Sequence, residues 1–150
     1  MVENVLLFLK PKDDVSFFYD NLSVQDGLDY MKQHAFTSMP VINKSGKYVG
    51  SISEGDFLWH ILVSDKPTTQ TQLSKLIRKD YIPACTIDVS LEDLFQQSLK
   101  QNYVPIVDDR NIFIGIVTRQ AILAYLMKEA AQIEPIVRKE IEKQNKIESA

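Results

Sequence analysis

The 150-residue sequence contains a single cysteine, Cys85, so a disulfide within the chain is excluded. Its two histidines, His34 and His60, have no carboxylate or second ligand at metal-binding spacing, which favours structural roles for both. No apolar run approaches the ~20 residues that a membrane span needs. Residues 5–9 lack a basic leader and are too short for a signal-peptide core. We therefore expect a cytoplasmic chain with no membrane partner.

Several motifs that accompany enzyme chemistry are also missing. The sequence has no phosphate loop of the form Gly-x4-Gly-Lys and no dinucleotide motif Gly-x-Gly-x2-Gly. It likewise has no His-Glu-x2-His and no Gly-x-Ser-x-Gly, and no nucleophile–base pair can be named. The net charge of −3 argues against a broad surface for nucleic acid. We therefore predict that the protein is not an enzyme, has no cofactor or metal, and does not bind nucleic acid.

An internal repeat organises what the sequence does contain. Residues 38–52 and 103–117 each hold an apolar run with a proline, a polar turn and a second apolar run with a glycine, which predicts a hairpin. A serine or threonine then precedes apolar residues at helical spacing, which predicts a capped helix. The landmark pairs are each separated by 65 residues: Pro40 and Pro105, Gly50 and Gly115, Ser53 and Thr118. Three pairs at one offset indicate duplication.

Each repeat is predicted to be a β-α-β-β-α unit. Capping boxes at Ser23–Asp26 and Ser90–Asp93 begin the first helix of each unit, and strands are predicted at 15–19 and 82–87. The predicted divisions are repeat 1 at 13–64, a linker with a short helix (73–78) at 65–79, repeat 2 at 80–128, and a C-terminal helical tail at 129–150. Residues 1–12 are expected to form a lead-in helix or strand, and Pro135 is expected to kink or restart the tail helix. One unit has too few apolar residues to bury its own sheet face, so the two should share a joint core.

The doubled unit, with its Pro-bearing strand and its Gly-h-h-[Ser/Thr] strand end (h hydrophobic), resembles the CBS domain, named after cystathionine β-synthase. The resemblance covers about residues 13–128. It implies an α/β fold in which two CBS repeats pack with pseudo-twofold symmetry. It also implies a non-catalytic regulatory module that binds an adenine nucleotide between the repeats.

A narrower resemblance is carried by residues 36–41 and 112–119. These are similar to the small stand-alone CBS proteins of the bacterial phylum Firmicutes, several of which bind cyclic di-AMP and pass the signal to partner proteins. We therefore expect cyclic di-AMP ahead of AMP, ADP and ATP, together with an unidentified target protein. A homodimer is expected through spare apolar residues at Phe57, Trp59, Ile61 and the helix after Ala121.

Two clefts between the repeats are predicted, and the first is expected to hold the ligand. Arg119 lies in the first turn of a helix, where a cation is unfavourable and backbone N–H groups attract anions, so it is a candidate phosphate contact; the alternative is an exposed arginine without a role. For Phe17, the alternative to a place in the first cleft is ordinary packing in the core. Asp13 and Asp14 stand where the cyclic-nucleotide-binding relatives tend to be basic. The resemblance assigns these residues to the first cleft: Ser16, Phe17, Thr37, Ser38, Thr118, Arg119 and Gln120.

The second cleft is assigned Ser53, Asp56, Ala84 and Tyr103. Asp56 matches the ribose-binding position of the family, and it also completes a capping box with Ser53, so both roles stay open. Repeat 2 has Ala121 in place of that carboxylate, and Glu54 lies where Arg119 does. A phosphate-rich ligand should therefore favour the first cleft. The alternative function is a structural or interaction protein whose clefts are filled by side chains such as Phe17 and Tyr103.

Overall fold

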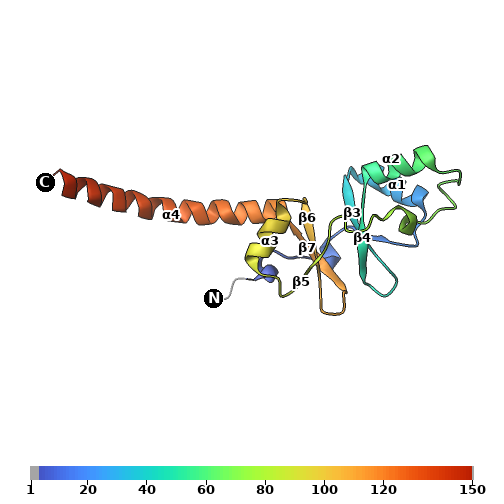
Figure 1. The fold of residues 1–150 in the computed structure, drawn as a ribbon, viewed down its shortest axis with the longest axis horizontal. Helices are drawn as coiled ribbons and strands as arrows, with labels where there is room; N and C mark the ends of the chain where they lie inside the picture. Colours follow the sequence, from blue (N-terminus) through green and yellow to red (C-terminus); the bar gives the residue numbers. More distant parts are fainter. Residues whose placement is uncertain (1–3, 150) are drawn as a thin grey trace.

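A computed structural model describes residues 4–149 and contains the β-α-β-β-α unit twice (Figure 1). The first unit consists of β2 (Phe18–Tyr19), α1 (Val24–His34), β3 (Ser38–Ile42), β4 (Tyr48–Ser53) and α2 (Glu54–Val63). The second consists of β5 (Cys85–Thr86), α3 (Leu91–Ser98), β6 (Tyr103–Val107), β7 (Phe113–Thr118) and α4 (Arg119–Glu148). Before the first unit lie η1 (Val5–Leu7), β1 (Lys10–Pro11) and η2 (Lys12–Asp14), and η3 (Leu73–Leu76) lies between the units. The predicted order of elements is confirmed.

The two sheets repeat one topology. In the first sheet the order is β2-β3-β4, with β2 parallel and β4 antiparallel to β3. The second sheet has the order β1-β7-β6-β5, with the same arrangement around β6 and one further strand at its edge. Val41 faces Gly50 across the first hairpin, and Ile106 faces Gly115 across the second. The 65-residue offset is therefore reproduced in the strand register.

Local sequence explains where the helices begin. The side chains of Ser23, Ser53, Ser90 and Thr118 each accept a hydrogen bond from the backbone N–H three residues further on. The predicted strands at 15–19 and 82–87 are shorter in the structure, where β2 and β5 have 2 residues each. Each of these strands pairs with only one neighbour in its sheet. The predicted short helix at 73–78 is a 3-10 helix at Leu73–Leu76.

Helix α4 begins on repeat 2 and then projects away from both repeats as a long arm (Figure 1). Its 30 residues run through Pro135, so of the two predicted effects the restart of the helix is wrong, while a kink stays a prediction. A proline removes one backbone N–H and crowds one carbonyl in the preceding turn, and here the turns on both sides continue the helix. Within residues 4–149, no helix combines the length and the apolar character needed to cross a bilayer.

Buried apolar side chains form three clusters, and one of them is the joint core that the sequence predicted. One cluster lies within each repeat, under its own helices. A third joins the repeats and contains Ile42, Tyr48, Ile82, Tyr103, Val107, Phe113 and Ile116. The hairpin loops also meet, because the Phe113 N–H donates to the Gly46 carbonyl at 2.9 Å and the Tyr48 N–H to the Asn111 carbonyl at 3.1 Å. The two sheets are thus held face to face by a shared apolar layer.

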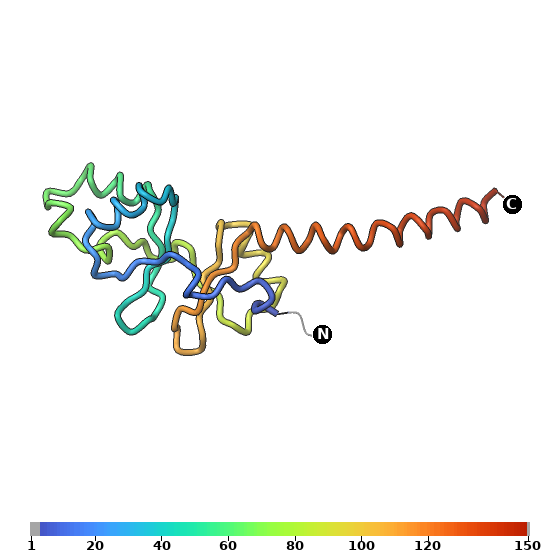
Figure 2. Tube along the Cα trace, turned by 180° about the vertical axis from the view of Figure 1, so that it is seen from behind, coloured from blue at the N-terminus to red at the C-terminus, as the bar shows by residue number. Residues whose placement is uncertain are grey.

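Each repeat completes its core with a segment that precedes the other repeat. Val5 and Phe8 lie before repeat 1, yet they belong to the repeat 2 core with Leu94 and Val104. Leu73 and Leu76 precede repeat 2 and lie in the repeat 1 core. Figure 2 shows the N-terminal segment, in blue, beside repeat 2 before it reaches repeat 1. The packing therefore crosses the predicted divisions at 13–64 and 80–128, because these lead-in segments are exchanged.

Glycine permits the close approach of each exchanged segment. Gly50 and Gly115 have φ values of 149° and 154°, a conformation that other residues rarely adopt. A Cβ at Gly115 would lie 2.2 Å from the Lys10 carbonyl oxygen, and one at Gly50 would lie 2.4 Å from Ile77 Cγ2. The clash at Gly115 would be with backbone that cannot move away, because Lys10 pairs with Ile116 on β7. The two glycines occupy equivalent positions in the repeats, and each leaves room for a lead-in segment.

We predict that Gly115→Ala lowers the free energy of unfolding by about 2–4 kcal/mol, because it adds both backbone strain and a clash with β1. Urea denaturation measures the effect. Gly55→Ala is the matched control, since a Cβ there would meet nothing closer than 3.7 Å, within a helix; its stability should match or exceed that of the wild type. Equal stabilities for the Gly115 and Gly55 variants would contradict the close-approach role.

Candidate ligand-binding cleft

A cavity of about 580 Å³ lies where the two repeats meet. Its walls come from the segment before β2, the start of β3, the end of β7 and the start of α4. The predicted first-cleft residues among its lining are Ser16, Thr37, Ser38, Thr118, Arg119 and Gln120. The structure thus brings together six of the seven residues predicted for this cleft. Their contact with a ligand stays a prediction.

Phe17 is the seventh, and the structure places it elsewhere. Its ring packs edge-on against Tyr19 and Phe113, with centroid distances of 5.6 and 6.0 Å, and it borders the shared apolar layer. The Lys12 ammonium lies 5.3 Å from the same ring. The core alternative for Phe17 is therefore correct, and its assignment to the first cleft is wrong.

Tyr103 was predicted in the second cleft, but it lines the first. Its hydroxyl donates to Ser51 Oγ at 2.6 Å and lies 3.4 Å from Ser38 Oγ. Burial raises the pKa of Tyr103 to about 12, so the phenol stays neutral and keeps its proton at physiological pH. Tyr103 and Ser38 occupy equivalent positions in the two repeats. Tyr103 is the larger of the two side chains, and its hydroxyl forms part of the polar wall of the first cleft.

The Arg119 side chain is held by hydrogen bonds to other parts of the protein. Its Nε donates to the Ser98 carbonyl at 2.7 Å, and one terminal nitrogen donates to Asn102 Oδ1 at 2.9 Å. The other terminal nitrogen reaches the Leu99 carbonyl at 3.5 Å. These carbonyls end α3, where a cation is electrostatically favourable. The predicted alternative of an arginine without a role is wrong, and a guanidinium held in this way still has N–H groups available at the cavity.

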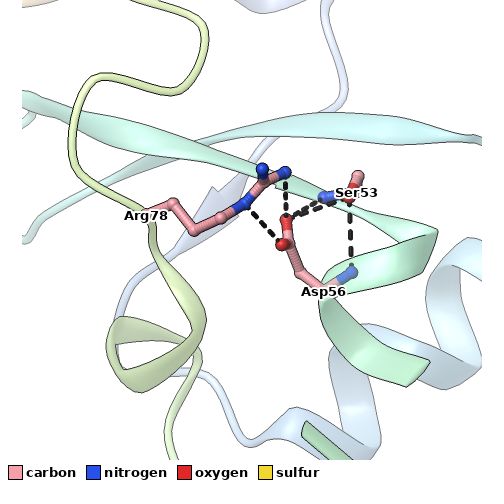
Figure 3. Close-up of polar contacts among 3 residues, drawn as sticks. All are labelled: Ser53, Asp56 and Arg78. Carbon is pink, nitrogen blue, oxygen red and sulfur yellow. Dashed lines mark hydrogen bonds and ion pairs between the residues drawn. The ribbon is translucent and has the colours of Figure 1, made fainter. Parts of the chain in front are cut away.

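The second cleft is closed by an ion pair. Figure 3 shows Arg78, from the segment between the repeats, extending to Asp56 at the start of α2. Arg78 Nε lies 2.7 Å from Asp56 Oδ1, while Oδ2 accepts from the Ser53 N–H at 2.8 Å and the Ser53 hydroxyl at 3.0 Å. The guanidinium also stacks on the Tyr81 ring at 3.7 Å. Asp56 therefore has its acceptor capacity occupied by protein groups, and its side chain is 8% exposed.

The other residues predicted for the second cleft do not assemble into a cavity with Asp56. Ala84 packs against the shared apolar layer, and Ser53 caps α2. Tyr103 lies in that layer and lines the first cavity. The two clefts differ because equivalent positions hold side chains of different size and charge.

Sequence reasoning missed the two cations of the clefts. Lys10 lines the first cavity, and Arg78 closes the second cleft. A signal was present, because residues 5–10 and 73–78 match at an offset of 68: Val5 with Leu73, Phe8 with Leu76, Lys10 with Arg78. That offset equates two cations and could have drawn attention to both.

Comparison with known proteins agrees with this geometry. The model of the CBS domain family matches residues 3–63 and 73–128. Cystathionine beta-synthase of Dictyostelium discoideum is 32% identical over 103 residues, which are 65% of this chain and 20% of that protein. Inosine-5'-monophosphate dehydrogenase of Nitrosopumilus maritimus is 26% identical over 103 residues, 67% of this chain and 20% of that protein. The chain spans about a fifth of the length of these curated relatives.

Solved structures share the fold over nearly the whole chain. CbpB in complex with c-di-AMP is 24% identical with a TM-score of 0.82, over 89% of this chain and 90% of that one. CbpB from Streptococcus agalactiae is 25% identical with a TM-score of 0.78, over 87% and 84%. CBSX2 in complex with AMP is 23% identical with a TM-score of 0.71, over 86% and 99%.

We predict that Asp56 and Arg78 are energetically coupled. A double-mutant cycle with Asp56→Ala, Arg78→Ala and the double variant should give a coupling free energy of about 0.5–1 kcal/mol, because the arginine is half exposed. Urea denaturation at low and high salt measures it, and the coupling should shrink with added salt. Additive effects of the two substitutions would show that the ion pair does not hold the cleft closed.

Proposed function

Because this chain belongs to the CBS domain family and carries the domain twice, we propose that it binds one adenine nucleotide in the first cleft and passes that state to a partner protein. The observation that carries the proposal is the cavity of about 580 Å³ lined by both repeats. A cavity of this size accommodates a small-molecule ligand. A ligand there would contact β3 of repeat 1 and α4 of repeat 2 at once, and so would fix their relative position.

The chemistry of the lining favours a nucleotide. The first turn of α4 supplies N–H groups and the positive end of the helix dipole, and Arg119 adds a cation. The hydroxyls of Thr37, Ser38 and Thr118 can accept from or donate to a base, a ribose or a phosphate. Apolar contact is available from Met39 and Pro40. Phosphate would lie at the helix start and the base nearer β3.

Among adenine nucleotides we place cyclic di-AMP ahead of AMP, ADP and ATP. Two relatives of the same fold were solved with such ligands, CbpB with c-di-AMP and CBSX2 with AMP. The first cleft lacks the ribose carboxylate, since Ala121 stands at the position of Asp56, and it has a cation at the helix start. Both features favour phosphate contacts over ribose contacts. The nucleotide is a regulatory ligand in this scheme, and no catalytic step is assigned to it.

Signalling follows from what the ligand would hold in place. The nucleotide binds the arrangement in which the β3 start and the α4 start both reach it, so it shifts the population toward that arrangement. Because α4 continues as the projecting arm, a change at its first turn alters where the arm lies relative to repeat 1. An unidentified target protein would respond to that difference.

The alternative function, an interaction protein whose clefts are filled by side chains, is supported only at the second cleft. There the Arg78 guanidinium stacks on Tyr81, and Asp56 is already paired with Arg78. The first cleft has an open volume lined by six of its predicted residues, whereas none of the residues predicted for the second cleft lines the cavity beside Arg78 and Tyr81. We therefore expect one nucleotide per chain.

We also propose a homodimer through α2 and the start of α4. Phe57, expected at this surface, is 1% exposed and belongs to the repeat 1 core, so that expectation is wrong. Trp59 and Ile61 are exposed as expected. Three exposed apolar pairs are related by the 65-residue offset: Leu58 with Leu123, Ile61 with Leu126, Leu62 with Met127. A surface that has the pseudo-twofold symmetry of the fold can pair with a second copy of itself.

Titration calorimetry with cyclic di-AMP tests the ligand proposal. Wild-type protein should bind one molecule per chain, and ligand at ~100 times its dissociation constant should raise the stability by ~2.7 kcal/mol in a melt. Arg119→Ala should weaken binding by about ten- to a hundredfold, because a charge-assisted hydrogen bond is lost. Asp56→Ala is the control, and it should leave affinity nearly unchanged, since Asp56 faces Arg78.

Two results would contradict this scheme. Absence of binding with every adenine nucleotide would favour the interaction-protein alternative. Loss of binding in Asp56→Ala alone would mean that the second cleft is the binding site. Because Arg119 also holds the end of α3, the melting temperature of each ligand-free variant is recorded, and affinities are compared where both are folded.

Light scattering tests the dimer. Wild-type protein at micromolar concentration should show twice the chain mass of 17.2 kDa, and Leu62→Glu should reduce it to a single chain. Leu7→Glu is the control, since Leu7 is 58% exposed but lies in η1, outside α2 and α4. A wild-type monomer, or equal masses for the two variants, would contradict the proposed surface.

A further inference from the structure

Two cations occupy equivalent places in the exchanged lead-in segments. Lys10 follows Val5 and Phe8, which complete the repeat 2 core, and Arg78 follows Leu73 and Leu76, which complete the repeat 1 core. Each segment passes over the glycine of the hairpin that it covers, at Gly115 and Gly50. Lys10 and Arg78 therefore stand at matching places, one at each cleft.

Their surroundings differ in one carboxylate. Arg78 has Asp56 at 2.7 Å and Tyr81 under its guanidinium. At the first cleft the residue equivalent to Asp56 is Ala121, whose N–H only completes the cap with Thr118. Within residues 4–149, Lys10 has no ion-pair partner. One cation is thus neutralised by the protein, and the other is left at an open cavity.

The backbone around Lys10 is fixed. Lys10 pairs with Ile116 on β7, and Ile116 itself lines the cavity. The Lys10 carbonyl lies over Gly115, which leaves no room for the strand to shift toward β7. A long side chain on a fixed strand is a mobile point charge that can reach a phosphate without moving the backbone.

The cavity lining also contains one acidic residue, Asp14. Lys10 and Arg119 outnumber it, so the charged side chains of the lining sum to a single positive charge. Without Lys10 that sum would be zero. The anion preference of the cleft therefore depends on Lys10 as much as on Arg119.

We propose that Lys10 binds a phosphate group of the nucleotide in the first cleft, in the place where Arg78 closes the second cleft against Asp56. This inference rests on the proposed function, and it assigns the phosphate contact to a residue outside both predicted repeat boundaries. The phosphate site would then be formed by two segments, with Lys10 from the segment before repeat 1 and Arg119 from repeat 2. The competing explanation is that Lys10 only keeps the exposed edge strand β1 soluble.

Titration calorimetry with cyclic di-AMP separates the two. Lys10→Ala should weaken binding by about tenfold, and it should lower the salt dependence of the affinity. Lys10→Arg should retain most of the affinity. Lys12→Ala is the matched control, because Lys12 lies two residues away with the same charge, packs on Phe17 and is absent from the cavity lining. Its affinity should equal that of the wild type.

The outcomes distinguish this inference from the proposed function. Wild-type protein that binds no adenine nucleotide would overturn both. Binding by the wild type with equal affinities for Lys10→Ala and Lys12→Ala would overturn the Lys10 role alone, and so would equal losses in both variants. Melting temperatures of the ligand-free variants, which should match the wild type because the Lys10 side chain is exposed, identify any loss that comes from unfolding.

Discussion

The crossing of the two lead-in segments is the constraint on which the rest of the structure depends. Each segment fills the core of the repeat it does not precede, so neither repeat has a complete core by itself. The crossing brings the Lys10 backbone against Gly115 and the Ile77 side chain against Gly50, closer than a Cβ at either position would allow. Since the crossings tie the repeats at two places, the clefts between them have defined walls. A cavity lined by both repeats is a consequence of this exchange.

Duplication supplied two equivalent clefts, and a few substitutions made them unequal. Three pairs of equivalent positions hold different residues: Tyr103 and Ser38, Asp56 and Ala121, and Arg78 and Lys10. On one side the larger or charged groups satisfy one another within the protein, as in the Arg78–Asp56 pair. On the other side there is a cavity, and its Lys10 has no ion-pair partner within residues 4–149. Burial of Asp56 would be costly without a partner, so the same pair that closes the cleft also stabilises α2.

Features set by neighbouring residues were predictable from the sequence, and features set by distant ones were not. The hairpins, the serine and threonine caps and the 65-residue offset depend on local pattern, and the structure confirms them. The side to which Phe17 points, the wall formed by Tyr103 and the pairing of Arg78 with Asp56 depend on contacts between segments far apart in the chain. The same holds for the lead-ins: residues 5–9 look like a weak apolar segment until their 68-residue partner is found.

The position of the first cleft also explains how a small ligand could affect a distant surface. Thr118 caps α4 and Arg119 anchors its first turn to the end of α3. A phosphate bound at that turn competes with, or reinforces, the hold that α3 has on α4. The same helix carries the exposed apolar residues proposed for dimerisation and continues as the arm. Rotation of a rigid helix about its first turn grows with distance along its 30 residues, so a small displacement at Arg119 becomes a larger one at the arm.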